Sequence, residues 1–238
     1  MSQLLSQTVK RIVKSIPGTN RVLRMSLRIL RKQYWRHNLR RENLAEIGPN
    51  FPNQLFWSQT ELIQIMSPPG TTVLELGCQN GKALHAAAIR FPGSKFLGVD
   101  ISREAIAAAK ALTSQKPTEN VAWFAGDIFE FLKANTEPIH VLCSCATLIY
   151  FSEKELEQLL SVLRDRGLKA LALCEVTARG QRSVKEHIYA HNYEAIIAKV
   201  FGKKNRGLNY SKTPFKYEPW ESQNFEGAIH FFKVSATL

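Results

Sequence analysis

The chain has 238 residues and a mass of 26.9 kDa, so it can bury a sizeable core without disulfides or bound metal. Its 45% hydrophobic and 22% charged residues, with 13 Gly and 10 Pro, exclude the collagenous, disordered and disulfide-scaffold classes. No apolar run reaches the roughly 18 residues of a membrane span, and no signal-peptide pattern opens the chain. All four cysteines lie in apolar, strand-like surroundings, which is typical of reduced thiols and predicts a cytoplasmic protein.

The formal net charge of +12 comes from the first part of the chain. Residues 1–41 contain eleven Lys and Arg and no Asp or Glu, which leaves 21 basic against 20 acidic residues in 42–238. Apolar residues recur at helical spacing within this stretch, and basic residues stand between them. The apolar positions are Leu5, Val9, Ile12, Ile16, Leu23, Leu27 and Leu30. We therefore divide the chain into a basic, amphipathic helical arm over residues 1–47 and a domain over residues 48–238.

Several roles suit such an arm. A basic amphipathic helix can lie on an anionic membrane surface, where each base contributes about 1 kcal/mol, so the protein would be cytoplasmic but peripheral to a membrane. The same apolar stripes can pack on the body as a lid, and a mitochondrial targeting segment also has this composition. Tyr34 and Trp35 could stack on RNA bases, but the near-neutral body weighs against nucleic acid.

Beyond Gly70, short apolar runs alternate with helix-like segments. Strands are predicted over residues 72–77, 95–100, 121–125, 139–145 and 168–175, with a last strand over 229–234. Helices are predicted over 82–90, 102–113 and 152–164, the last opened by a capping box of Ser152 and Glu155. This alternation is typical of an α/β fold with a mostly parallel sheet and crossover helices.

The first predicted strand runs into a loop with two glycines that opens a helix, residues 73–82 (VLELGCQNGK). In an open α/β sheet, ligands bind at the carboxyl ends of the strands, and glycines there let the backbone approach the ligand. The loop is not the dinucleotide fingerprint, because Gln79 and Lys82 stand at its second and third glycine positions. We therefore expect a nucleotide-like ligand other than NAD or FAD.

The sequence of this loop resembles the first motif of the class I S-adenosylmethionine (SAM) methyltransferases. Glu75, Gly77 and Gly81 match the acidic residue and two of the glycines, and Gln79 departs from the middle glycine. The resemblance is good over residues 71–176. It implies a Rossmann-like class I methyltransferase fold, in which a mostly parallel seven-stranded sheet carries helices on both faces. It also implies that SAM is the cofactor and S-adenosylhomocysteine (SAH) the product.

Two aspartates follow the second and third predicted strands, as the resemblance implies. A carboxylate such as Asp100 at a strand end can accept hydrogen bonds from both hydroxyls of a ribose. Asp127 can accept from the adenine amino group, while Glu75 either holds the loop through backbone N–H groups or meets the cationic end of the cofactor. Either aspartate taken alone would more often be a helix N-cap. The predicted cofactor-binding residues are Glu75, Gly77, Cys78, Gly81, Asp100, Ile101, Asp127, Ile128 and Ser144.

Methyl transfer to an oxygen usually needs a base at the same edge of the sheet. Glu175 ends the fifth predicted strand, and His191 and Tyr193 lie where the next helical segment begins. Residues 191–197 resemble the segment of some sugar and natural-product methyltransferases that brings polar side chains over the acceptor. We predict His191 as the base, with Glu175 and Tyr193 as further catalytic candidates. The alternatives are that His191 is a helix cap or surface residue and that Glu175 orders a loop.

Residues 143–146, Cys-Ser-Cys-Ala, differ from the Asn/Asp-Pro-Pro-Tyr/Phe motif of methyltransferases that act on amino groups of adenine or glutamine. The cysteines and histidines lack the spacing of a metal site, so no metal is expected. The sequence thus predicts SAM-dependent methyl transfer to a small acceptor, a hydroxyl of a sugar, glycolipid or natural-product scaffold. Two alternatives stay open: an RNA methyltransferase that uses the basic arm, and a non-catalytic peripheral membrane protein with this fold. The oligomeric state is not predicted.

Overall fold

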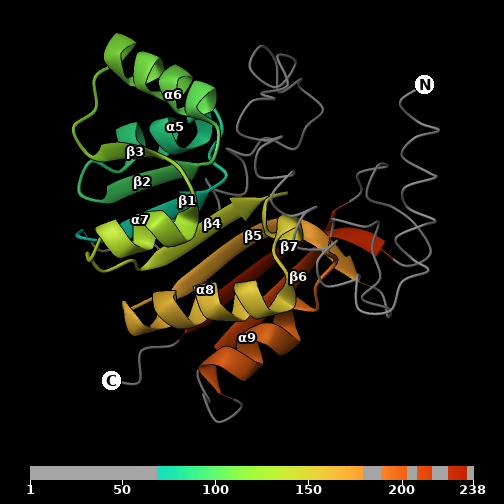
Figure 1. The fold of residues 1–238 in the computed structure, drawn as a ribbon. Helices are drawn as coiled ribbons and strands as arrows, with labels where there is room; N and C mark the ends of the chain where they lie inside the picture. Colours follow the sequence, from blue (N-terminus) through green and yellow to red (C-terminus); the bar gives the residue numbers. More distant parts are fainter. Residues whose placement is uncertain (1–68, 179–188, 203–207, 216–224, 235–238) are drawn as a thin grey trace, which may run out of the picture.

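The strand order β3-β2-β1-β4-β5-β7-β6 defines a seven-stranded sheet at the centre of the protein (Figure 1). The structure is a computed structural model that describes residues 69–178, 189–202, 208–215 and 225–234. The strands are β1 (Thr72–Leu76), β2 (Lys95–Asp100), β3 (Val121–Ala125), β4 (Val141–Cys145), β5 (Ala170–Ala178), β6 (Leu208–Phe215) and β7 (Phe225–Val234). Strands β1 to β5 pair in parallel, whereas β7 runs antiparallel to both β5 and β6. The predicted α/β class and the mostly parallel seven-stranded sheet are confirmed.

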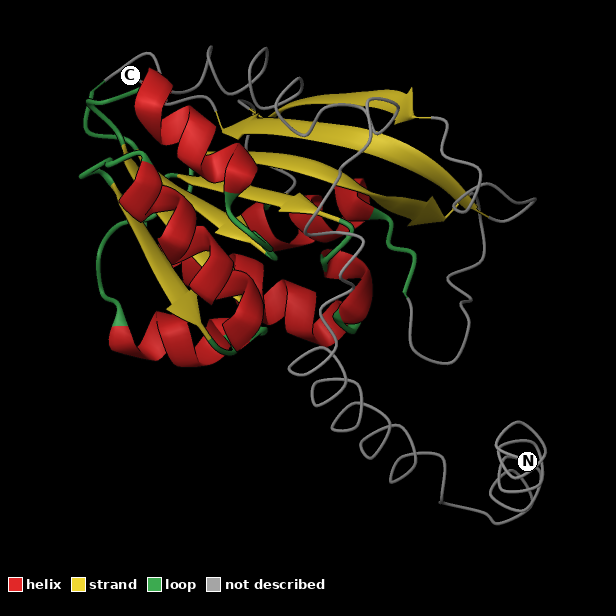
Figure 2. Ribbon diagram, turned by 90° about the horizontal axis from the view of Figure 1, so that it is seen from above, coloured by secondary structure: helices red, strands yellow, loops and turns green. Residues whose placement is uncertain are grey.

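Helices cover both faces of this sheet (Figure 2). They are α5 (Lys82–Arg90), α6 (Arg103–Gln115), α7 (Ile128–Ala134), α8 (Glu153–Asp165) and α9 (Tyr193–Phe201), together with the short 3-10 helix η1 (Leu148–Tyr150). Leu84 and Ala88 of α5 pack against Phe96 and Val141 on one face, and buried residues of α7, α8 and α9 form the larger core on the other. Among the described residues, no helix combines the length and the apolar character needed to cross a membrane.

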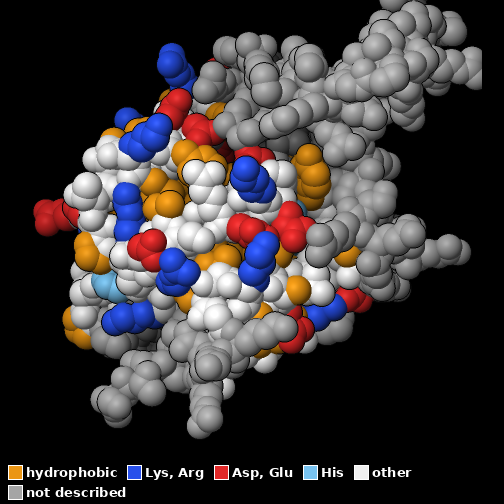
Figure 3. All heavy atoms as spheres, turned by 60° about the horizontal axis from the view of Figure 1, so that its bottom comes forward, with side chains coloured by type: hydrophobic (Ala, Val, Ile, Leu, Met, Phe, Trp, Pro, Cys, Tyr) orange, Lys and Arg blue, Asp and Glu red, His pale blue; other side chains and the backbone are white. Residues whose placement is uncertain are grey.

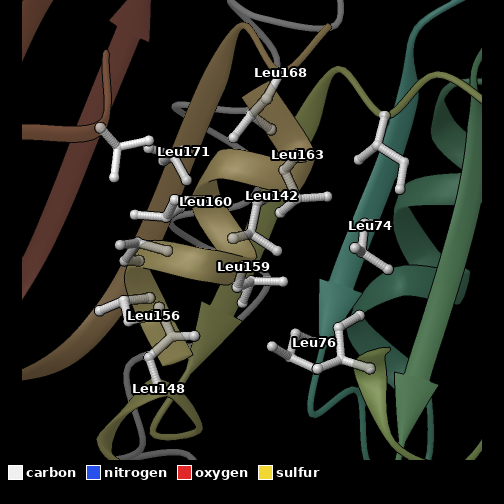
Figure 4. Packing of buried hydrophobic residues seen from close by; sticks show 14 of the residues in the cluster. Leu74, Leu76, Leu142, Leu148, Leu156, Leu159, Leu160, Leu163, Leu168 and Leu171 are labelled. Atoms are coloured by element: carbon white, nitrogen blue, oxygen red, sulfur yellow. The ribbon is translucent and has the colours of Figure 1, made fainter. Parts of the chain in front are cut away.

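The core follows from the apolar pattern of the chain. All five residues of β1 are buried, Thr72 and Glu75 included, as expected of a parallel strand with helices on both faces of its sheet. In α8, Leu156, Leu159, Leu160 and Leu163 recur at helical spacing and face the sheet (Figure 4). The predicted capping box is confirmed at the start of this helix, because the side chain of Ser152 accepts from the N3 backbone and the N3 Glu side chain accepts in return.

Several features of the fold were not predicted from the sequence. Among them are the helix α7, the 3-10 helix η1 and the strand β6, and β7 begins at Phe225 rather than at residue 229. A helix of seven residues shows too few turns for its periodicity to be recognised. The basic arm over residues 1–47 lies outside the described residues.

Charges of both signs are interspersed on the face shown in Figure 3. Among the described residues, Lys199 pairs with Glu157 and Lys95 with Glu137, both at 2.5 Å. Exposed pairs of this kind contribute little to stability. The mixture of signs on the face shown agrees with the near-neutral formal charge of residues 42–238.

Candidate functional site

The carboxyl ends of the parallel strands β1 to β4 lie at one edge of the sheet. From β1 the chain crosses to β2 on one side, while β4 pairs with β1 on the other. The loops that follow β1 and β4 therefore diverge at this point, which is where open α/β sheets bind their ligands. The loop over residues 77–81, Asp100 and Asp127 all come to this edge, as the sequence predicted.

Both glycines of the loop after β1 adopt positive φ, at +76° for Gly77 and +71° for Gly81. A Cβ on Gly77 would lie 2.0 Å from Oγ1 of Thr147, and one on Gly81 would lie 2.4 Å from a ring carbon of Trp123. The sequence analysis gave these glycines the role of leaving room for a cofactor. The structure adds that the space of each missing Cβ is taken by another side chain of the protein.

The backbone at Gln79 explains how this residue can replace the middle glycine of the motif. Gln79 has φ +50°, a conformation that a glycine would adopt without strain. Its backbone N–H donates to Oδ2 of Asp100 at 3.0 Å, while Oδ1 accepts from the N–H of Ser102 at 2.9 Å. Asp100 thus ties the loop after β1 to the start of α6. The N–H of Ile101 also stabilises this carboxyl, and of the roughly four lone pairs of a carboxylate these contacts leave acceptor capacity for a ligand.

Glu75 is a buried carboxyl with an unusual proton affinity. Its Oε2 has no hydrogen-bond partner among the described residues, and its side chain is buried. Burial raises the pKa of Glu75 to about 8, and the charge of Asp100 adds to the shift. The same burial raises the pKa of the thiols of Cys78 and Cys143 well above the usual value, so both are protonated.

Asp127 caps a helix. Its Oδ1 accepts from the N–H of Phe129 at 2.9 Å and so begins α7, which is the N-cap alternative weighed in the sequence analysis. Ile128, which the sequence predicts to bind the cofactor, is only 3% exposed and belongs to the same core cluster as the leucines of α8. The reason is that Ile128 is the first residue of α7 and faces the sheet. Ile101 is half-buried at the end of β2.

Ser144 and Glu175 are in direct contact. Oγ of Ser144 donates to Oε1 of Glu175 at 2.7 Å, and both residues are fully buried. The same Oε1 accepts from the backbone N–H groups of Thr147 at 3.1 Å and Leu148 at 3.0 Å. Burial raises the pKa of Glu175 to about 7, and these hydrogen bonds oppose part of the shift. Through Oε1 Glu175 therefore orders a loop, while its Oε2 has no hydrogen-bond partner among the described residues.

His191 and Tyr193 are both buried beside the ends of β4 and β5. Nε2 of His191 lies 3.0 Å from the carbonyl of Phe151, and since a carbonyl only accepts, this nitrogen carries a proton. His191 also forms an isolated parallel bridge with Thr177 of β5. Burial raises the pKa of Tyr193 well above its usual value, and the nearby charge of Glu175 adds to the effect. The base role of His191 stays a prediction.

Residues 67–221 match a family model described as a methyltransferase domain. The chain belongs to this methyltransferase family. The magnesium protoporphyrin IX methyltransferase of Synechocystis PCC 6803, with bound SAM, shares the fold at 16% identity and a TM-score of 0.58, over 87% of this chain and 96% of that one. The plantazolicin methyltransferase BpumL, in complex with SAH, matches at 15% identity and a TM-score of 0.56, over 92% and 100%.

A third structure is the phosphoethanolamine N-methyltransferase 2 of Haemonchus contortus in complex with SAM. It matches at 15% identity and a TM-score of 0.57, over 75% of this chain and 52% of that one. A search of curated proteins by sequence gave no match. At these identities the solved structures show the fold, and they confirm the Rossmann-like class I methyltransferase architecture.

The methyltransferase also contains a buried histidine that the sequence analysis did not single out. His230 of β7 lies between Oγ1 of Thr177 at 2.6 Å and Oη of Tyr210 at 3.1 Å, and burial lowers its pKa to about 4. The sequence does contain a signal for its burial: His230 and Phe232 are two residues apart in a strand and therefore share a face, and Phe232 lies in the core. Within the described ranges, no three His, Cys, Asp or Glu side chains are grouped as a metal site requires.

Proposed function

We propose that this methyltransferase takes its methyl group from SAM and transfers it to a hydroxyl of a small acceptor, of sugar, glycolipid or natural-product type. The observation that carries the proposal is the arrangement at the end of β1 and β2. There, a buried carboxyl oxygen without a described partner, on Glu75, lies beside Asp100 and a loop that opens α5.

The residues at this edge suit the chemical groups of SAM. SAM carries a carboxylate, a cationic amino acid portion and a ribose. Helix α5 begins at Gly81 without a side-chain cap, whereas Ser102, Asp127, Ser152 and Asn192 cap α6 to α9. The first turn of α5 can therefore accept a carboxylate, which the helix dipole stabilises, although Asn80 makes one long contact of 3.4 Å with the N–H of Lys82.

The carboxyl groups of Glu75 and Asp100 suit the cationic portion and the ribose of SAM. A cationic group beside Glu75 would favour its ionised form and offset the unfavourable effect of burial. Asp100 keeps acceptor capacity beside its backbone contacts, which suits the hydroxyls of the ribose. When bound, SAM supplies an activated methyl group on a sulfonium. What the chain contributes is to hold and orient the two reactants and to exclude water.

Cofactor binding is tested by calorimetry on the full chain with SAM and SAH. Replacing Asp100 by Ala removes two charge-assisted hydrogen bonds to the ribose, each worth about 1.5 to 3 kcal/mol, so affinity should fall by more than tenfold. Asp165→Ala is the matched control, because Asp165 is exposed and pairs with its neighbour Arg164 at the end of α8. No heat with either ligand at millimolar concentration would overturn the proposal.

The choice of acceptor rests on the sequence and on the basic arm. Eleven bases without an acidic residue in 1–41 favour an acceptor presented at an anionic membrane, which a glycolipid can be. The informative assay offers labelled SAM with free glycans, phenols, total RNA, and glycolipids in vesicles with or without phosphatidylserine. Label in glycans, phenols or glycolipids supports the proposed acceptor class. Label in RNA alone would establish the RNA alternative instead.

A further inference from the structure

The turn that follows β4, residues 146–151, is held by hydrogen bonds from two distant segments. Its first residue, Ala146, has φ +53° and donates its N–H to the carbonyl of Cys174 at 2.9 Å. Further along the turn, the carbonyl of Ile149 accepts from the N–H of Tyr189 at 2.7 Å. Together with the contact of His191 to Phe151, these bonds fix the turn against β5 and the start of α9.

Glu175 provides the side-chain acceptor in this arrangement. Its Oε1 receives the N–H groups of Thr147 and Leu148 and the hydroxyl of Ser144, all within 3.1 Å. Burying a carboxyl is unfavourable unless its hydrogen bonds compensate, and a backbone N–H bound to a carboxylate is about twice as strong as a neutral pair. A fully buried Glu that binds consecutive N–H groups of one turn therefore determines where that turn lies.

Thr147 connects this turn to the loop after β1 through a side-chain contact with Gly77. Its Oγ1 donates to the carbonyl of Cys145 at 3.1 Å, which fixes the rotamer of the side chain. Oγ1, Cβ and Cγ2 of Thr147 lie 2.0, 2.9 and 2.9 Å from the point where a Cβ of Gly77 would stand. The side chain thus covers Gly77, whose N–H binds the carbonyl of Val99 at 2.8 Å.

We infer that Glu175 is a positioning residue for the cofactor site. Its carboxyl holds the turn over residues 146–151 so that Thr147 keeps the loop after β1 in the shape that binds the cofactor. The inference rests on the proposed function, because it requires that this loop binds SAM. It gives Glu175 a role that acts through Thr147 and Gly77, without contact to the reacting atoms.

The experiment measures the dissociation constant of SAH by calorimetry on the full chain. Glu175→Leu removes the acceptor and should raise this constant at least tenfold, whereas Glu175→Gln keeps an amide oxygen and should remain within about threefold of the wild type. Thr147→Ala keeps the backbone N–H but removes the atoms over Gly77, and should raise the constant about five- to tenfold. The matched control is Glu157→Gln on the surface of α8, with no expected change.

A double variant tests whether Glu175 affects SAH binding through Thr147. If Glu175 acts through Thr147, Glu175→Leu combined with Thr147→Ala should bind SAH no more weakly than the weaker single variant. Additive losses would overturn this route, and wild-type affinity in Glu175→Leu would overturn the inference altogether. If Glu175→Leu fails to fold by circular dichroism, Thr147→Ala decides, because unchanged affinity there also overturns the inference. A wild-type protein that binds neither SAM nor SAH would instead overturn the proposed function, and the inference with it.

Discussion

Two buried glutamates at the same edge of the sheet differ in their surroundings. Both have an Oε2 without a hydrogen-bond partner among the described residues. Glu175, on β5, also accepts three hydrogen bonds on Oε1 and holds the turn after β4, whereas Glu75, at the end of β1, lies near the charge of Asp100. Glu175 thus fixes the shape of its own surroundings, while Glu75 experiences the repulsion of a second carboxyl group.

The proton affinities of the two carboxyls reflect this difference. Burial raises both pKa values, to about 8 for Glu75 and about 7 for Glu175. The nearby charge of Asp100 adds to the shift at Glu75, whereas hydrogen bonds oppose it at Glu175. Ionisation is thus less favourable at Glu75 than at Glu175, and a cationic ligand beside Glu75 would stabilise its ionised form.

The largest effect on stability is expected at the contact between Gly77, in the loop after β1, and Thr147, in the turn after β4. In Gly77→Ala, the new methyl group would meet Thr147 at 2.0 Å in a backbone with φ +76°, so the free energy of unfolding should fall by about 3 to 5 kcal/mol. Gly167→Ala is the control, because Gly167 has φ +88° but nothing within 4 Å, and should lose only about 1 to 2 kcal/mol. Urea unfolding measures both, and equal losses would contradict the contact between Thr147 and Gly77.

A smaller effect is expected in the pH dependence of stability that arises from Glu75. Because the pKa of Glu75 is raised to about 8, the folded state keeps a proton that the unfolded state releases above its ordinary pKa of 4.5. Stability of the ligand-free protein should therefore fall as pH rises, by about 3 kcal/mol between pH 5.5 and 8.5 from this group. Glu75→Gln should remove this loss.

The measurement is the free energy of unfolding in urea at both pH values, for the wild type and the variant. His230, whose pKa is lowered to about 4, gives the opposite slope below pH 6.5. That contribution is common to both proteins and cancels in the difference. The prediction fails if the variant loses as much stability as the wild type between the two pH values.

The smallest effect concerns the residue that departs from the family motif. Gln79→Gly relieves the strain of φ +50° by about 1 kcal/mol but makes the unfolded chain more flexible, so stability should change by less than about 1 kcal/mol. The affinity for SAH should stay within threefold, because the backbone N–H that binds Asp100 is kept. Ala146→Gly, at φ +53° in the turn after β4, is the matched control. A loss of affinity above tenfold in Gln79→Gly alone would show that the Gln79 side chain binds the cofactor.

Local sequence predicted some elements well and missed others for a physical reason. The capping box of Ser152 and Glu155 was predicted correctly because its residues are three apart and their hydrogen bonds depend on helix geometry alone. Helix α7, which Asp127 caps, was missed because a short helix has too little periodicity to be recognised. The hydrogen bond from Ser144 to Glu175 could not be predicted, because Glu175 stands 31 residues later in the chain.

The sequence by itself determined the α/β class, the order of the parallel strands along the chain and the loop that opens α5, because these depend on apolar runs, turn residues and short spacings. It could not determine which carboxyl groups are engaged. That depended on pairing between strands distant in sequence, which brings Glu175 to the turn after β4 and Thr147 over Gly77. Burial and hydrogen bonding, which set the state of a carboxyl, arise only when such distant segments pack together.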